Sequence, residues 1–322
     1  MMNLEEKRRG LTSYIIITSV RNEAPLIEMT IKSVIKQTVL PMKWIIVSDG
    51  STDGTDDIVT KYARERKWIE LLRLPERSGW HFTDKVNAFN AGYEKVKNLN
   101  YEIIGNIDAD LTFEKGYMEF LLSKFAENAN LGVAGTRLKE ESRQYDYRFT
   151  NIEHVSGACA LFRRKCFEDI GGYIPLKVEG TALMAVITAR LKGWQTRTFP
   201  EICCVHYPET RVGRQATSKT KFESGYHDYL MGSHAVWQGV RSIYQMRQKP
   251  FVVGGVALLS GYLWAMMTQA ERPVTKDLIK FYQMEQMSRL RGYLANFFTP
   301  LRRKSIFRNV LKDDSSKNME KS

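Results

Sequence analysis

Two carboxylates one residue apart are the side chains of this sequence best placed to do chemistry. Asp108 and Asp110 directly follow residues 101–107, a short apolar run that is typical of a buried strand. Ligands of open α/β sheets bind outside the carboxyl ends of the strands. Carboxylates with no cysteine or histidine beside them suit a hard cation such as Mg²⁺ or Mn²⁺, which commonly holds phosphates. A lone Asp-x-Asp is equally common in turns, so the pair needs support from the rest of the chain.

The elements that must position this pair are predicted by hydrophobic periodicity. The predicted strands are residues 14–19, 44–48, 69–74, 101–107, 132–135, 156–163 and 196–199. The first predicted helix begins after Pro25, which suits a first helical turn. The other predicted helices are residues 53 or 55 to about 66, 84–97, 115–128 and 181–192. Strand–helix alternation at this spacing predicts a parallel sheet with right-handed crossovers. The polar stretch between Thr136 and Ser156 is expected to form a loop over the site.

The composition is typical of a globular protein, and its positive net charge predicts an acidic partner. The chain has 322 residues, of which 43% are hydrophobic and 26% charged, and its net charge is +12. Such a charge predicts attraction to nucleic acid, to an anionic membrane surface or to phosphorylated substrates. No pattern of a zinc finger, an RNA-binding strand or a basic groove helix is present, so nucleic acid is not expected as a partner. The four cysteines fit no zinc site, and the lack of a leading apolar segment predicts a catalytic part in the cytosol.

The character of the sequence changes after His206. Amphipathic helices are predicted at residues 219–246 and 274–298, and the uncharged segment 251–267 lies between them. This segment borders the length needed to span a bilayer, although core packing or a dimer interface is an alternative. Positive charge on both sides favours an anchor that dips into the membrane or lies on anionic lipid. The basic tail 301–322 is expected to be disordered.

Several motifs in order resemble the glycosyltransferases of family 2, which have the GT-A fold. They are Arg21-Asn22-Glu23, residues 47–54, Lys85 to Asn90, Asp108-Ala109-Asp110, Ser156-Gly157-Ala158 with Arg163-Arg164, and Gly171-Gly172-Tyr173. The resemblance implies an α/β fold of GT-A type, which is Rossmann-like with a mostly parallel central sheet flanked by helices. It covers a catalytic domain at 11–208, with nucleotide-sugar binding at about 11–135 and the acceptor side at about 136–208. A helical, membrane-associating C-terminal region would then follow at 209–300.

The resemblance implies an inverting, metal-dependent sugar transfer from a nucleotide-sugar donor. The implied donor-binding residues are Asn22, Glu23, Asp49, Lys85, Asp108 and Arg163. Asp110 would ligate Mn²⁺ or Mg²⁺, with Asp108 at the ribose or at a metal-bound water, and the late His206 as a further ligand. His206 could equally be structural. Asp53 and Thr55 are interpreted as helix caps rather than ligands.

The general base of the reaction is the point where this chain departs from the family. Members often carry a Glu-Asp pair shortly after the Gly-Gly-aromatic motif, whereas only Glu179 is acidic here. An alignment on the following helix would instead place Thr181 and Ala182 at the pair. Three interpretations stay open, and the first is favoured. Glu179 is the base, or another acid such as Asp169 or Glu201 replaces it, or the acceptor is already an anion that needs no base.

The expected function is extension of a lipid-linked glycan or a surface polysaccharide, by a peripheral or monotopic protein at the cytoplasmic face of the cell membrane. Residues 253–259 and 285–290 resemble membrane-associated glycosyltransferases of polysaccharide assembly, which is an argument by analogy. One alternative is a polyprenyl-phosphate sugar synthase, and another is a catalytically silent GT-A membrane scaffold. A nucleotidyltransferase is disfavoured because no Gly-rich phosphate loop follows the first strand.

Overall fold

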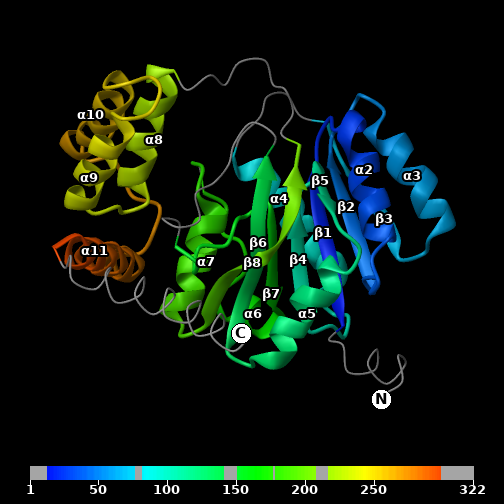
Figure 1. Cartoon of the computed structure of the whole chain (residues 1–322). Coiled ribbons are helices and arrows are strands. Elements are labelled where there is room, and N and C mark those ends of the chain that lie inside the picture. Colours follow the sequence, from blue (N-terminus) through cyan, green and yellow to red (C-terminus); the bar gives the residue numbers. More distant parts are fainter. Residues whose placement is uncertain (1–12, 77–81, 141–150, 177, 208–216, 299–322) are drawn as a thin grey trace, which may run out of the picture. The chain divides into compact units, whose positions relative to one another are not determined.

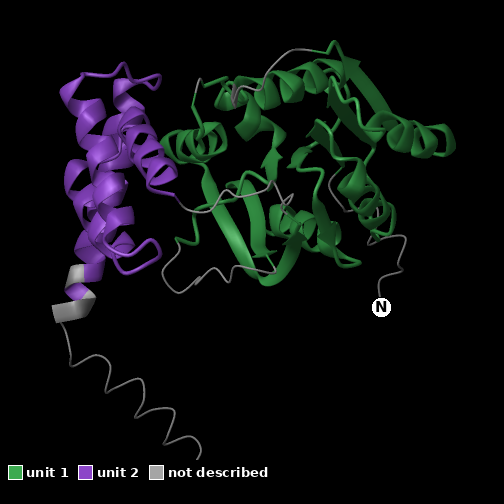
Figure 2. Cartoon of the chain, turned by 90° about the horizontal axis from the view of Figure 1, so that it is seen from above, with its two compact units in different colours: residues 1–215 green, residues 216–322 purple. Residues whose placement is uncertain are grey.

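The computed structural model describes residues 13–76, 82–140, 151–176, 178–207 and 217–298 (Figure 1). The chain divides into two compact units, residues 1–215 and residues 216–322, drawn in green and purple in Figure 2. The predicted boundary at 208/209 falls within residues 208–216, outside the described residues. The predicted tail at 301–322 and most of the predicted loop, residues 141–150, also lie outside them.

A mixed sheet forms the centre of the first unit, with the order β3-β2-β1-β4-β7-β6-β8-β5 among the described residues (Figure 1). Its strands are β1 (Tyr14–Val20), β2 (Lys43–Asp49), β3 (Ile69–Leu74), β4 (Ile103–Ile107), β5 (Leu111–Phe113), β6 (Leu131–Glu140), β7 (Cys159–Arg163) and β8 (Gln195–His206). The half β3-β2-β1-β4 is parallel, as predicted. The other half is mixed, because β7 runs antiparallel to both β4 and β6, and β5 runs antiparallel to β8. The expectation of a mostly parallel sheet therefore holds only for the first half.

Helices cover both faces of the parallel half, which explains its continuous apolar runs. These helices are α2 (Ala24–Ile35), α3 (Thr55–Glu65) and α4 (Phe82–Val96). Alternate residues of β1 belong to different cores: Ile16 packs in one hydrophobic cluster, while Ile15 and Ile17 pack in the other. Gly92 of α4 is required for this packing, because a Cβ there would lie 2.8 Å from the Ile17 side chain. Helix α4 therefore packs directly on the side chains of β1 and β2.

The second half of the sheet holds the differences from the predicted elements. Its helices are α5 (Tyr117–Glu127), α6 (Arg164–Asp169) and α7 (Thr181–Leu191). Strand β6 runs on to Glu140, where a loop was expected, and β8 runs from Gln195 to His206 rather than stopping at Phe199. The two strands pair in parallel along this length, with a register shift between Thr136 and Arg137. The pairing satisfies the backbone of a polar stretch that has no strand-like alternation.

The second unit is helical, with α8 (Ser218–Leu230), α9 (Ala235–Gln245), α10 (Val253–Met267) and α11 (Lys276–Phe298). The predicted helix 219–246 is interrupted between α8 and α9, where Gly232 adopts a positive φ of 85°. Helices α8 and α10 touch backbone to backbone at Gly225 and Gly261: a Cβ at either position would lie within 2 Å of a carbonyl oxygen of the other helix. No helix in the described part of the chain is both long and apolar enough to cross a membrane.

Candidate active site

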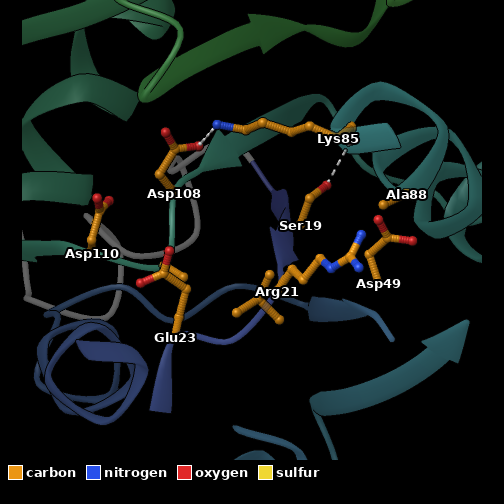
Figure 3. A pocket seen from close by; sticks show the side chains of 10 residues that line it. Ser19, Arg21, Glu23, Asp49, Lys85, Ala88, Asp108 and Asp110 are labelled. Carbon is orange, nitrogen blue, oxygen red and sulfur yellow. Dashed lines mark hydrogen bonds and ion pairs between the residues drawn. The ribbon is translucent and has the colours of Figure 1, made fainter. Parts of the chain in front are cut away.

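A cavity of about 190 Å³ opens at the carboxyl edge of the parallel strands (Figure 3). The residues that line it are Ser19, Val20, Arg21, Glu23, Asp49, Lys85, Ala88, Asp108, Ala109 and Asp110. Asp49 ends β2 and is 95% buried, and in Figure 3 the guanidinium of Arg21 points toward it. Four of the predicted donor residues, Glu23, Asp49, Lys85 and Asp108, are therefore brought together with the predicted metal ligand Asp110.

Asn22 joins two loops and does not line this cavity. Its backbone N–H donates to Ser51 Oγ at 3.1 Å, and its side-chain Oδ1 accepts from the Thr52 N–H at 2.8 Å. Its φ of 55° lies in the left-handed region, which asparagine tolerates better than most residues. The expectation that Asn22 contacts the donor is therefore replaced by a structural one: Asn22 holds the turn after β1 against the turn after β2.

Asp53 and Thr55 complete this connection between the two turns. Asp53 Oδ2 accepts from the Ala24 N–H at 3.0 Å, and Asp53 Oδ1 accepts from the Thr55 N–H at 3.0 Å. Thr55 Oγ1 in turn accepts from the Glu23 N–H at 2.9 Å. Burial opposes the ionised form of Asp53, but these hydrogen bonds outweigh it and hold its pKa below the usual range. Neither residue is the N-cap of α3, because that position is Gly54 and has no side-chain cap hydrogen bond, so the expectation of helix caps is wrong. Both residues instead join the two turns, and the network holds Glu23 at the rim of the cavity.

Lys85 and Asp108 form an ion pair at the centre of the edge, with Lys85 Nζ 2.6 Å from Asp108 Oδ1 (Figure 3). Ser19 Oγ donates to the Lys85 carbonyl at 3.0 Å and anchors the first turns of α4 to the end of β1. Burial opposes the charge on Lys85, but Asp108 outweighs it and raises the Lys85 pKa. Burial and the nearby carboxylate of Asp110 raise the pKa of Asp108 against the effect of Lys85. The edge thus still favours additional positive charge.

A second cavity, of about 460 Å³, shares Lys85 and Asp108 with the first. The other residues that line it are Val86, Phe89, Asn106, His154 to Ala158, Tyr173 and Val178 to Leu183. Gly157 allows α7 to begin directly against this cavity, because a Cβ at Gly157 would lie 2.4 Å from the Ala182 Cβ. Glu179 is exposed and lines this cavity, just before the helix begins. The two cavities meet at Lys85 and Asp108.

Asp169 and Glu201, the other candidate bases, line neither cavity. The Asp169 carboxylate accepts a hydrogen bond from the indole of Trp194 at 3.0 Å. Of the three acids considered from the sequence, Glu179 is the one that lines a cavity together with Asp108.

His206 lies between two carboxylates. Its Nε2 is 3.0 Å from Asp110 Oδ2, and its Nδ1 is 3.0 Å from Glu140 Oε1. The hydrogen bond that His206 donates to Asp110 is the main cause that raises the pKa of His206 to about 9, against the effect of burial. Sheet register sets this arrangement, because His206 of β8 pairs with Leu111 of β5 on one side and with Glu140 of β6 on the other.

Glu140 is the site residue that the sequence did not reveal. It lies in a stretch expected to be a loop, and its proximity to His206 depends on the pairing of β6 with β8 across 66 positions. No local pattern in the sequence predicts that β6 pairs with β8.

Asp110 and His206 fit a divalent cation in chemical type. Asp110 Oδ1 is buried and has no hydrogen-bond partner among the described residues, so the edge retains one unused acceptor. Within the described ranges, no three His, Cys, Asp or Glu side chains converge on one point as a complete metal site. Mg²⁺ and related ions are commonly held by one or two protein carboxylates together with substrate phosphates. The donor set here fits an ion shared with a phosphate ligand.

Arg163 lies at the other edge of the sheet and is not part of this site. It pairs with Ile103, the first residue of β4, whereas Asp108 follows the last residue of that strand. Its guanidinium donates to the carbonyls of Leu131, Phe125 and Asn128 at 2.8–3.1 Å. The expectation that Arg163 binds the donor is therefore wrong: its charge is used to satisfy carbonyls at the end of α5.

Comparison with known proteins finds similarity to sugar-transferring proteins. Residues 15–151 match the model of the family described as glycosyl transferase family 2. The chain is 24% identical over 232 residues to the poly-beta-1,6-N-acetyl-D-glucosamine synthase of Staphylococcus aureus (strain COL), which covers 65% of this chain and 53% of that protein. It is 23% identical over 232 residues, with the same coverage, to the synthase of that name from Staphylococcus epidermidis. The chain spans about half the length of the curated relatives it matches.

Solved structures share the fold at low sequence identity. The mannosyltransferase PcManGT from Pyrobaculum calidifontis, solved with GDP-Man and Mn²⁺, has a TM-score of 0.51 at 17% identity, covering 97% of this chain and 88% of that one. S. aureus TarS 1–349 with UDP-GlcNAc has a TM-score of 0.51 at 15% identity, covering 84% and 78%. GalNAc-T7 with UDP, GalNAc and Mn²⁺ has a TM-score of 0.57 at 13% identity, covering 94% and 62%. These likenesses show a mixed α/β fold of GT-A type.

Proposed function

We propose that this chain, whose residues 15–151 match the model of glycosyl transferase family 2, transfers a sugar, with inversion, from a nucleotide-sugar donor to a lipid-linked glycan or surface polysaccharide. One observation carries the proposal: the two cavities meet at Lys85 and Asp108. A donor in the first cavity and an acceptor in the second would bring their reacting atoms together there. Such positioning supplies a large part of the rate of a group transfer.

The first cavity would hold the nucleotide and the diphosphate. Asp49 and Glu23 offer carboxylate oxygens as acceptors for donors on the base or the ribose. Lys85 would be within reach of the diphosphate, because its side chain is 47% exposed and its ammonium group forms an ion pair with Asp108 at the mouth of both cavities. Mn²⁺ or Mg²⁺, held by Asp110 and His206 beside Asp108, would neutralise the negative charge of the departing nucleoside diphosphate.

The second cavity would hold the acceptor. Glu179 would accept the proton of the attacking hydroxyl, in the role of general base. Its exposure leaves the carboxylate accessible to a large acceptor, as a growing glycan requires. For inversion, the acceptor would attack the transferred carbon from the side opposite to the departing diphosphate.

The relatives suggest which donor to test first. The curated relatives are named as synthases of poly-beta-1,6-N-acetyl-D-glucosamine, and TarS was solved with UDP-GlcNAc. UDP-GlcNAc is therefore the first donor proposed for this chain, and GDP-Man, the ligand of PcManGT, is the second. We place the protein at the cytoplasmic face of the cell membrane, because an acceptor on a lipid would be presented there and the net charge of +12 favours anionic lipid.

The test is donor turnover by the purified protein. We expect Mn²⁺-dependent hydrolysis of one nucleotide sugar in a screen of UDP-, GDP- and dTDP-sugars, reduced at least about 100-fold in Asp110→Ala. Asp57→Ala, which removes an exposed carboxylate of α3, is the matched control and should keep wild-type turnover. Unchanged hydrolysis in Asp110→Ala would contradict the assigned site. Donor binding without turnover, even with a membrane lipid extract as acceptor, would favour a catalytically silent scaffold.

A further inference from the structure

Helix α9 buries its polar face and exposes its apolar face, which is the opposite of the usual arrangement in water. Its buried stripe is polar: Gln238 is 0% exposed and Ser242, one turn later, is 1% exposed. The amide of Gln238 and the hydroxyl of Ser242 have no hydrogen-bond partner among the described residues. Its outward stripe is apolar and is formed by Val236, Val240, Ile243 and Tyr244, each 44–60% exposed. A helix normally buries its apolar stripe and leaves its polar stripe to water.

The apolar surface continues into the turn that joins α9 to α10. Phe251, Val252 and Val253 follow one another there, and each is 56–58% exposed. We name the outward stripe of α9 together with these three residues the α9 surface. Soluble proteins rarely leave this many large apolar side chains of one helix and the residues after it uncovered without a partner.

Basic side chains predominate along α9, the following turn and α10, and one of them, Arg241, forms an ion pair with Asp228 of α8. Residues 235–267, which contain α9, the turn and α10, hold three basic residues and no acidic residue. They are Arg241, Arg247 and Lys249, and all three are exposed. Arg247 and Lys249 come shortly before the apolar tripeptide 251–253, so two cations and three apolar side chains lie within seven residues. This combination fits a surface that offers negative charge above an apolar layer.

We propose that the α9 surface docks on an anionic lipid bilayer, with its apolar side chains at the boundary of the acyl chains and with Arg247 and Lys249 at the phosphates of the headgroups. The inference deepens the membrane location in the proposed function and rests on it for its biological role. It differs from the segment indicated by the sequence, because the docking helix is α9 with the 251–253 turn rather than residues 251–267 as a whole. Trp264 of α10, 54% exposed, supplies an aromatic side chain of the kind that prefers the membrane interface.

A second copy of the chain is a poorer occupant of this surface. A symmetric dimer brings the same patch of both copies together. It would therefore place Arg247 and Lys249 of one copy near those of the other, with no acidic residue between 235 and 267 to offset them. Like charges brought together in this way disfavour association, whereas an anionic bilayer gains from every cation.

Binding to vesicles tests the proposal with the full chain. We expect sedimentation with vesicles of phosphatidylcholine containing 30% phosphatidylglycerol, a composition chosen as a rough mimic of an anionic membrane, and at least about tenfold weaker binding to phosphatidylcholine alone. The double variant Val240→Asp/Ile243→Asp should lose binding about tenfold or more. Leu40→Asp, which changes an exposed apolar residue of the first unit, is the matched control and should bind as the wild type does. Arg247→Gln/Lys249→Gln should weaken binding to the anionic vesicles, while Lys95→Gln/Lys192→Gln should weaken it less.

A second readout does not depend on the charged substitutions. The emission of Trp264 is the difference in tryptophan fluorescence between the wild type and Trp264→Phe. Brominated lipids should quench this emission, which reports whether α10 lies at the bilayer. Equal binding of the Val240→Asp/Ile243→Asp variant and the wild type, or no binding to anionic vesicles, would overturn the proposal. The proposal would also be overturned if light scattering showed that the wild type is a dimer, and that this variant is a monomer that still binds vesicles. Donor hydrolysis measured without lipid keeps the two proposals separate, because it should be the same in the wild type and in every α9 variant.

Discussion

At the scale of single residues, the arrangement Asp110–His206–Glu140 explains how one imidazole could be kept in position for a cation. Glu140 lies 3.0 Å from Nδ1 of His206, while Nε2 faces Asp110 at the same distance. A carboxylate on the far nitrogen fixes the tautomer and the ring orientation of a metal-binding histidine. Glu140 thus acts on the proposed metal through His206 and is a positioning residue rather than a ligand.

We predict that Glu140→Gln weakens Mn²⁺ binding in the presence of UDP by about 10–100-fold, the usual effect of removing such a partner. Isothermal titration with Mn²⁺ measures this directly. Nitrogen chemical shifts of His206 should also report a changed tautomer in the metal-free protein. Glu119→Gln, which alters an exposed acid of α5 that contacts Thr38, should leave both measurements unchanged. Wild-type Mn²⁺ affinity in Glu140→Gln would show that Glu140 does not position His206.

At the scale of elements, the turns after β1 and β2 behave as one unit because side chains tie them together. Asp53 connects to Ala24, and Asn22 connects to Thr52, so the wall that carries Glu23 depends on the turn after the neighbouring strand. The charge of Asp53 strengthens its hydrogen bonds.

This connection has a defined pH dependence. The pKa of Asp53 is lowered in the folded protein, so its contribution to stability is fully present above its unfolded pKa of about 4. It is lost as the pH falls through the lower folded pKa. We predict that Asp53→Ala lowers the free energy of unfolding by about 1 kcal/mol at pH 7, and that the difference from wild type shrinks below pH 4. Urea unfolding at pH 7, 5 and 3.5 measures it, and a difference that grew toward acid would contradict the assigned sign.

The helical unit depends on two glycines for the packing of α8 against α10. A Cβ at Gly225 would lie 1.8 Å from the Leu258 carbonyl oxygen, whereas a Cβ at Gly239 of α9 would meet nothing within 4 Å. We predict that Gly225→Ala forces the helices apart and costs about 2 kcal/mol of unfolding free energy. Gly239→Ala should instead stabilise by about 0.5–1 kcal/mol, since alanine is the better helix former. Equal stabilities of the two variants in urea unfolding would refute the close helix contact.

The same scale decides what could be predicted from the sequence. The end of β4 was predictable because an apolar run ends at two acids, and the strand lies in the locally patterned parallel half. Glu140 was not predictable, since only the pairing of β6 with β8 brings it to His206. Arg163 was misplaced because a motif names a residue without showing which edge of the sheet it reaches. The buried polar stripe of α9 was hidden for a related reason: periodicity shows two faces of a helix but not which one is covered.

At the scale of the whole molecule, the first unit contains both cavities, and they meet at Lys85 and Asp108. This arrangement predicts that donor cleavage and sugar transfer are separable, because Asp110 serves the first cavity and Glu179 the second. When Glu179, the proposed general base for the acceptor hydroxyl, is removed, water could still attack a donor held beside the metal. The proposed acceptor would need Glu179 for transfer.

Glu179→Gln therefore tests the account most directly. With the donor identified by the screen and an acceptor glycan added, we predict that acceptor-dependent transfer falls by about 10²–10⁴-fold while Mn²⁺-dependent donor hydrolysis stays within about twofold of wild type. Glu201→Gln and Asp169→Asn, which change acids outside both cavities, should retain transfer. Transfer that persists in Glu179→Gln and disappears in one of the other two would contradict the assignment of the second cavity as the acceptor site.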